Sequence, residues 1–374
     1  MKIRSIETFP VIYPTHGRFK FLETPQGKRS GRAAVLVKIT SDEGIVGWGE
    51  SIPVSTWTYE TLETVTLTIR HYFAPSLLGH DPFDIAGLHR IMDRTIRPGF
   101  TTGQPLCRSG IDIAVHDLVC KALHCSLAQY WGHAGNQEIL LSWTLNPSHP
   151  DDLDRMIEEG WEKGYRNFNV KVAPDPRQDM ELCRRVKERV PDGFLWADAN
   201  GGYDLASALR VAPKLADIGV DVLESPLPPN QISGYQQLKQ QGALPILMDE
   251  GVVSPRDLLE FIRLNMLDGV AMKPARCGGL YPARRQIELL QDAGLLFFGS
   301  GLSDPDVSLA ASLQLFGAYQ LSAPAALNGP QFLDHSVLES PLVPQAGKLR
   351  IPQGIGLGIT IDEQKIQPIK SELE

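Results

Sequence analysis

The sequence predicts an α/β protein in which a closed barrel of βα units follows an α+β segment. From about residue 138 onward, eight short β-rich runs alternate with amphipathic helical stretches. Before them, roughly 125 residues combine strand-like alternation with helical spacing. Eight consecutive units favour a closed barrel over a doubly wound sheet, and the glycine-rich first turn that such a sheet would need is missing.

The N-terminal segment, residues 1–125, is predicted to form an α+β capping domain. It begins with two apolar-alternating stretches, IRSIETFPVIY and AAVLVKITSDEGIVGWGES, the second interrupted by a turn at Asp42-Glu43-Gly44. Helical spacing follows in TLETVTLTIRHYFAPSLL and IDIAVHDLVCKAL. Antiparallel strands followed by helices are therefore expected here.

The barrel is expected to span residues 126–345. Its eight predicted strands lie in the runs ILLSWTL, NFNVKV, FLWADA, VDVLES, PILMDE, GVAMKP, LLFFGSGL and AALNGPQF. The glycine-rich tail RIPQGIGLGITIDEQKI is again strand-like. We expect this last segment, residues 346–374, to return to the capping domain.

The composition of the chain argues against some classes of binding partner. Its 374 residues carry 36 basic and 44 acidic side chains, a formal net charge of −8, which argues against nucleic acid or an anionic membrane as a partner. No apolar run approaches the roughly 20 residues of a membrane span, and the N-terminus lacks a signal-peptide core. The five cysteines form no CxxC pair, so we expect a reduced, cytoplasmic protein.

Ionisable residues recur at the ends of five successive predicted strands. They are Lys171, Asp198, Glu224, Asp249 and Lys273, separated by 27, 26, 25 and 24 residues. Each separation is close to one βα repeat, and barrel enzymes carry their active sites at the C-terminal ends of the strands. The sequence therefore predicts a ring of charged side chains at one mouth of the barrel.

The three carboxylates at the centre of this ring suit a hard divalent cation. Asp198, Glu224 and Asp249 offer only oxygen ligands, which Mg²⁺ prefers, with Mn²⁺ as a substitute. Lys171 and Lys273 flank them and are predicted to remove and return a proton α to a metal-bound substrate carboxylate, through an enediolate. The alternatives are helix caps or lysine pairs, a Schiff-base aldolase, and a non-catalytic, metal-stabilised barrel.

With these residues in view, the chain resembles the enolase superfamily, in its mandelate racemase and muconate lactonizing branch. The resemblance rests on GIVGWGE, SGIDIAVHDLVCKAL, NVK, DANGGYD, LESPLPP, PILMDE and KPARCGG, and covers nearly the whole chain. It implies a modified (β/α)7β barrel beneath the capping domain. It also implies Mg²⁺ on the three carboxylates, acid/base lysines on opposite faces of the enolate, and supporting roles for Asn200 and Glu250.

A few positions define the branch of the family and the departures of this chain from it. No histidine lies between His149 and His335, so the histidine base of mandelate racemases is missing, and Lys273 matches the muconate-lactonizing type. The first lysine of the usual Lys-x-Lys is Asn169, which either hydrogen-bonds a substrate carboxylate or fills the strand. Asp304 and Asp306 either contact the substrate or form a turn around the intervening proline.

Two capping-domain stretches are predicted to cover the site. Thr15 to Arg32 is long, polar and glycine-punctuated, with Arg18 and Lys20 able to meet a substrate anion. The second stretch contributes Trp57 and Tyr59. A lid is favoured over a solvated loop for both.

The resulting hypothesis is a Mg²⁺-dependent isomerase, either an epimerase or racemase or a cycloisomerase, of a small polar or cyclic carboxylic acid. A sugar-acid or hydroxy-acid dehydratase working through the same enolate is the alternative. The resemblance also implies a homo-oligomer, a dimer or an octamer.

Overall fold

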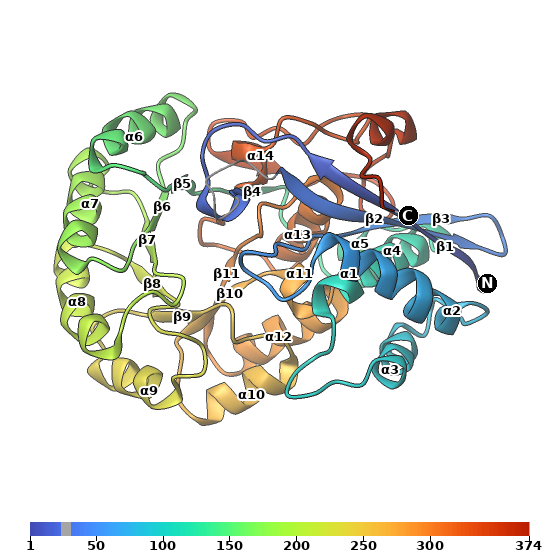
Figure 1. Cartoon of the computed structure of the whole chain (residues 1–374), viewed down its shortest axis with the longest axis horizontal. Coiled ribbons are helices and arrows are strands. Elements are labelled where there is room, and N and C mark those ends of the chain that lie inside the picture. Colours follow the sequence, from blue (N-terminus) through green and yellow to red (C-terminus); the bar gives the residue numbers. More distant parts are fainter. Residues whose placement is uncertain (24–30, 374) are drawn as a thin grey trace.

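A computed structural model describes residues 1–23 and 31–373 of the chain. The N-terminal part is a three-stranded antiparallel sheet backed by helices (Figure 1). Its elements are β1 (Ile3–Tyr13), the 3-10 turn η1 (Lys20–Leu22), β2 (Arg32–Ser41), β3 (Val46–Ser51), α1 (Leu62–Thr68), the π turn η2 (Ile69–Phe73), α2 (Ala74–Leu77), α3 (Ile85–Thr95), α4 (Pro105–Ala122) and α5 (Leu127–Tyr130). The turn between β2 and β3 falls at the predicted Asp42–Gly44 position.

Helix α4 packs so closely against β3 that the two backbones are in contact. A Cβ atom on Gly49 would lie 1.9 Å from the carbonyl oxygen of Gly110, and one on Gly47 would lie 2.1 Å from that of Ala114. Only glycine permits so close an approach of strand and helix. Nearly all of α4 is consequently buried, which is why its sequence lacks a polar stripe.

The predicted barrel is confirmed as a curled parallel sheet of seven strands with helices outside it (Figure 1). The strands, in spatial and chain order, are β5 (Trp143–Leu145), β6 (Phe168–Lys171), β7 (Leu195–Asp198), β8 (Val222–Glu224), β9 (Ile246–Met248), β10 (Gly269–Met272) and β11 (Leu296–Gly299). The helices between and after them are η3 (Pro150–Asp152), α6 (Leu153–Glu162), α7 (Pro176–Arg189), α8 (Leu205–Ile218), α9 (Ile232–Gln241), α10 (Pro255–Arg263), α11 (Pro274–Cys277), α12 (Leu280–Asp292) and α13 (Asp306–Ala318).

The eighth predicted strand is reduced to two single bridges. Ala325 bridges Leu141 and Ala326 bridges Ser300, both in parallel, and the run then turns into the short helix α14 (Gly329–Phe332). These bridges join the two ends of the seven-stranded sheet. The turn that follows carries Pro330, which has no backbone N–H for a ladder.

The first predicted run of the barrel divides into two strands. Residues Glu138–Leu140 form β4, which pairs antiparallel with β12 (Lys348–Arg350) near the tail, whereas β5 belongs to the barrel. The tail then contacts the N-terminal sheet, since Lys370 bridges Val11 just after the 3-10 turn η4 (Glu363–Ile369). The first and last segments of the chain thus lie together (Figure 1).

An apolar layer fills the barrel below its C-terminal mouth. It consists of Trp196, Val222, Leu247, Ala271, Phe298 and Ala326. Because strand residues alternate between faces, the residues two positions further along β7 and β8 also point inward, one layer higher. None of the helices within the described residues is both long and apolar enough to span a membrane.

Candidate active site

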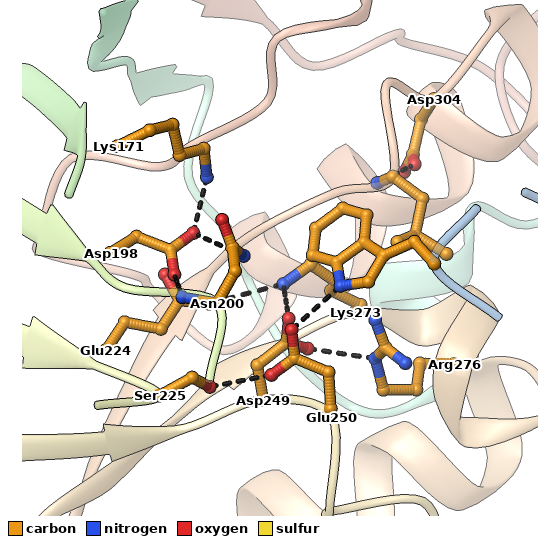
Figure 2. Close-up of polar contacts among 12 residues, drawn as sticks. Lys171, Asp198, Asn200, Glu224, Ser225, Asp249, Glu250, Lys273, Arg276 and Asp304 are labelled. Atoms are coloured by element: carbon orange, nitrogen blue, oxygen red, sulfur yellow. Dashed lines mark hydrogen bonds and ion pairs between the residues drawn. The ribbon is translucent and has the colours of Figure 1, made fainter. Parts of the chain in front are cut away.

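The strand register brings the predicted charged residues to one level at the barrel mouth. Lys171 is paired with Asp198, and Asp198 with Glu224, across β6, β7 and β8. Asp249 directly follows β9 and Lys273 directly follows β10. Figure 2 shows the five side chains converging from these strand ends.

The two lysines contact opposite ends of the row of carboxylates (Figure 2). The ammonium of Lys171 forms an ion pair with Asp198 Oδ2. Lys273 Nζ lies 2.7 Å from Asp249 Oδ2 and 3.4 Å from Glu224 Oε1. All three carboxylates are at most 1% exposed, so their negative charge depends on these cations for compensation.

Burial and neighbouring charges shift these groups in different directions. Burial, together with the negative charge of Asp198, raises the pKa of Glu224 well above its usual value. Burial alone would also raise the pKa of Asp198, but the Lys171 ammonium lowers it. Burial would lower the pKa of Lys273, but the carboxylates of Asp249 and Glu224 raise it. Glu224, the middle carboxylate of the row, is therefore the one whose negative charge is least compensated by a neighbouring cation.

A second set of side chains surrounds the row. Asn200 donates from its backbone N–H to Asp198 Oδ1 at 2.9 Å and from Nδ2 to Oδ2 at 3.1 Å. Arg276 donates from Nε to Asp249 Oδ1 at 2.9 Å. Glu250 Oε2 accepts a hydrogen bond from Ser225 at 2.7 Å. Arg276 was not among the predicted site residues, although it lies one helical turn after Lys273, a spacing that could have indicated it.

The donor chemistry of the site fits Mg²⁺. Three buried carboxylates on successive strand ends provide the hard oxygen ligands that this ion prefers. In the described part of the chain, however, no group of three or more His, Cys, Asp or Glu side chains is arranged to hold a metal ion. The ammonium groups of Lys171 and Lys273 contact the carboxylate oxygens instead. The fit therefore rests on the type, charge and burial of the donors, and not on a preformed cage.

The capping domain reaches the mouth through an aromatic chain. Phe19 stacks on Phe332 of α14 with ring centroids 4.8 Å apart, and Phe21 stacks on Trp57 at 4.1 Å. The indole N–H of Trp57 donates to Glu250 Oε1 at 2.8 Å. Residues 18–23 thus lie over the barrel, as the lid hypothesis requires. Residues 24–30 of the same predicted lid lie outside the described residues.

The other predicted residues of the capping domain differ in their relation to the site. Lys20 is exposed at the surface, while desolvation by neighbouring atoms and the Lys171 ammonium lower its pKa. Arg18 is directed sideways, to Glu23 at 2.9 Å and to Ser148 beyond β5. Tyr59 is 66% exposed.

Asn169 lies inside the barrel one layer below Lys171 and is 1% exposed. Within the described residues, neither its Oδ1 nor its Nδ2 has a hydrogen-bond partner. A buried amide without partners is costly, and the choice between a hydrogen bond to a substrate carboxylate and a strand-filling role stays a prediction for this residue.

Asp304 makes its hydrogen bonds within the loop and helix that follow β11, whereas Asp306 bonds to a segment beyond α14. Asp304 accepts from the backbone N–H of Leu302 and from Ser312, and Asp306 accepts from Ser336 and the N–H of Val337. The choice between substrate contact and a turn around Pro305 stays a prediction for both residues. The buried Arg32 supports the same loop by donating to the carbonyl oxygens of residues 302 and 303, a role for which the sequence offered no signal.

The fold and the site together define a class: a barrel enzyme whose strand-end carboxylates and paired lysines lie under a capping domain. Family comparisons agree with this class. Residues 14–132 match the mandelate racemase / muconate lactonizing enzyme N-terminal domain, and residues 152–365 match the enolase C-terminal domain-like family. The chain belongs to the mandelate racemase/muconate lactonizing enzyme family of the enolase superfamily, as its motifs predicted.

Similar proteins span the full length of the chain. Chloromuconate cycloisomerase CbnB of Cupriavidus necator is 30% identical over 373 residues, 98% of each chain. The N-succinyl-L-Arg/Lys racemase of Bacillus cereus is 27% identical over 371 residues, covering 99% of this chain and 98% of its own. Among solved structures, 2-chloromuconate cycloisomerase from Rhodococcus opacus 1CP aligns over 100% of both chains with a TM-score of 0.92 and 27% identity.

Proposed function

We propose that this protein is a Mg²⁺-dependent isomerase that removes the proton α to the carboxylate of a small-molecule substrate. The observation that carries the proposal is the contact of Lys171 and Lys273 with opposite ends of one buried row of carboxylates. Two bases on either side of a bound acid can take a proton from one face and return it on the other. Similarity to cycloisomerases and to a racemase supports isomerisation over the dehydratase alternative.

In this proposal each residue has a defined task. Asp198, Glu224 and Asp249 hold Mg²⁺, which when bound would neutralise the charge that develops on the substrate carboxylate. Lys171 and Lys273 exchange the α-proton at their Nζ atoms, and each must lose its own proton before acting as a base. Asn200 and Arg276 hold the outer carboxylates in place through the hydrogen bonds described above. The lid residues Phe21 and Trp57 exclude water from the mouth.

The finer parts of the proposal concern substrate and organisation. Members of the family named above act on muconates and on N-succinylated amino acids, so we propose a polar or cyclic carboxylic acid of these kinds. We further propose a cytoplasmic homo-oligomer whose subunits divide into residues 1–125, 126–345 and 346–374.

Proton NMR in D₂O with Mg²⁺ tests this function. The probes are cis,cis-muconate, N-succinyl-L-arginine, N-succinyl-L-lysine and a set of hydroxy acids. We expect deuterium at the α-carbon or an isomerised product with wild-type protein, and loss of turnover in Lys171→Ala and Lys273→Ala. Lys163→Ala, which removes an exposed lysine of the α6 region, is the control that should retain activity. Turnover that persists in either active-site variant would show that the corresponding lysine is not a base.

A further inference from the structure

The ammonium of Lys273 is enclosed by groups of two kinds. Asp249 and Glu224 contact it with their carboxylates, at 2.7 and 3.4 Å. The third neighbour is the indole of Trp57, whose ring centroid lies 5.4 Å from Nζ. This is within the range of a cation–π interaction, which is strongest when the cation is withdrawn from water. Lys273 is 3% exposed, so that condition is met.

Trp57 is itself fixed from several directions, although it belongs to the capping domain. Its Nε1–H donates to Glu250 at 2.8 Å, and the other oxygen of Glu250 accepts a hydrogen bond from Ser225 at 2.7 Å. Phe21 stacks on the indole with an interplanar angle of 12°. The guanidinium of Arg276 also lies 5.5 Å from the ring. The indole is therefore a rigid surface shared by the lid and the barrel.

We propose that Trp57 is a positioning residue for Lys273, so that closure of residues 18–23 over the barrel and orientation of this lysine are one event. The expected effect on α-proton exchange rests on the proposed function. The expected effect on the position of Lys273 rests on the contacts described above. Both carboxylates near Lys273 are proposed ligands of Mg²⁺ and would then be engaged elsewhere. The indole is the neighbour whose contact with the ammonium no metal ligation would remove.

Lys171 provides the internal comparison. Lys171 forms an ion pair with Asp198, at the opposite end of the row. Within the described residues, Lys273 faces the indole of Trp57, whereas no aromatic ring faces Lys171 in the same way. Loss of the indole should therefore affect one lysine and leave the other. A residue that served only as a wall of the lid would affect both lysines alike, because water would enter the whole mouth.

The first test measures lysine accessibility without substrate or metal. Wild type, Trp57→Phe and Trp57→Leu are treated with formaldehyde and a mild borohydride, and methylation of each lysine is followed by peptide mass spectrometry. We expect methylation of Lys273 to accelerate, relative to Lys171, by about 2- to 30-fold in the leucine variant, the range that a cation–π contact corresponds to. The phenylalanine variant keeps an aromatic face and should lie between.

The matched control is Trp161→Phe. Trp161 also faces a cation, since the guanidinium of Arg166 lies 3.6 Å from its ring, but it belongs to the outer helix α6. This variant should leave the ratio of Lys273 to Lys171 methylation unchanged. An unchanged ratio in the Trp57 variants, or an equal rise at both lysines, would overturn the proposal.

The second test uses the two halves of the reaction. Exchange of the α-proton in D₂O is measured from each enantiomer of N-succinyl-lysine, and Lys171→Ala and Lys273→Ala identify the lysine that serves each enantiomer. We expect Trp57→Phe to slow the Lys273-dependent exchange and to spare the other. Equal slowing of both exchanges refutes the positioning role. If wild type exchanges neither enantiomer, the methylation ratio alone decides the inference, and the choice of substrate in the proposed function is what has failed.

Discussion

Glu50 is a buried carboxylate at the junction between the capping sheet and the barrel. It lies in β3 and accepts a hydrogen bond from the hydroxyl of Tyr13 at 2.9 Å. Its second oxygen accepts from the backbone N–H groups of Val307 and Ser308, both at 3.0 Å, in the first turn of α13. Burial nevertheless dominates and raises the pKa of Glu50 from 4.5 to about 8.

This pKa makes the stability of the protein depend on pH in a defined direction. Between the ordinary pKa of 4.5 and the folded value of about 8, the folded protein holds a proton that the unfolded chain has lost. The contribution of Glu50 to the free energy of unfolding is therefore largest at low pH and declines as pH rises through this window. From about pH 5.5 to about pH 7.5 the loss amounts to about 2–3 kcal/mol.

Glu50→Gln isolates this contribution, because glutamine resembles the protonated acid and cannot ionise. Urea unfolding is measured for wild type and variant at both pH values, and the variant should gain about 2–3 kcal/mol relative to wild type between the lower and the higher pH. Glu7→Gln, an exposed acid of β1, is the control and should track wild type. A difference between Glu50→Gln and wild type that stays constant with pH would refute the argument, since Glu50 would then be ionised in the folded protein.

Three further predictions concern packing and metal binding. Arg32→Met should lower the free energy of unfolding by about 3–5 kcal/mol, because five carbonyl oxygens, four of them in buried hydrogen bonds, lose a donor. Urea unfolding measures this loss. Gly49→Ala should cost about 2–4 kcal/mol where its Cβ meets α4, whereas Gly99→Ala, with open space around it, should be neutral in thermal unfolding. Millimolar Mg²⁺ should raise the melting temperature of wild type but not of Asp249→Asn, and an equal rise in both would exclude Asp249 as a ligand.

The sequence by itself was sufficient for the fold class and the family. Both can be recognised from local patterns without knowing which residues are in contact. These patterns are the alternation of apolar strands with amphipathic helices, and motifs such as LESPLPP and KPARCGG. The regular spacing of Lys171, Asp198 and Glu224 also predicted a common level at the strand ends. The register of parallel strands gives that outcome because each βα repeat returns the chain to the same edge of the sheet.

The same local reasoning failed where the chain meets itself at long range. The eighth apolar run looks like a strand, yet it forms two bridges and a helical turn. Its pairing depends on Leu141 and Ser300, which lie on distant segments of the chain. Asp304 and Asp306 looked equally suited to a substrate or a turn. The partner of Asp304 at Ser312 is local, but the partner of Asp306 at Ser336 lies on another segment that only the folded chain brings near.

The details of the site were decided by tertiary structure alone. Sequence spacing places Lys273 at the mouth, but not its contact with the indole of Trp57, which comes from more than 200 residues away. Nor does it reveal that Asn169 is buried with both amide atoms unpaired among the described residues, or that Arg276 holds Asp249. Periodicity determines which face of a strand or helix a residue occupies. Which side chain it meets there depends on packing between distant segments, and that packing also sets the burial and charge on which the chemistry of the site depends.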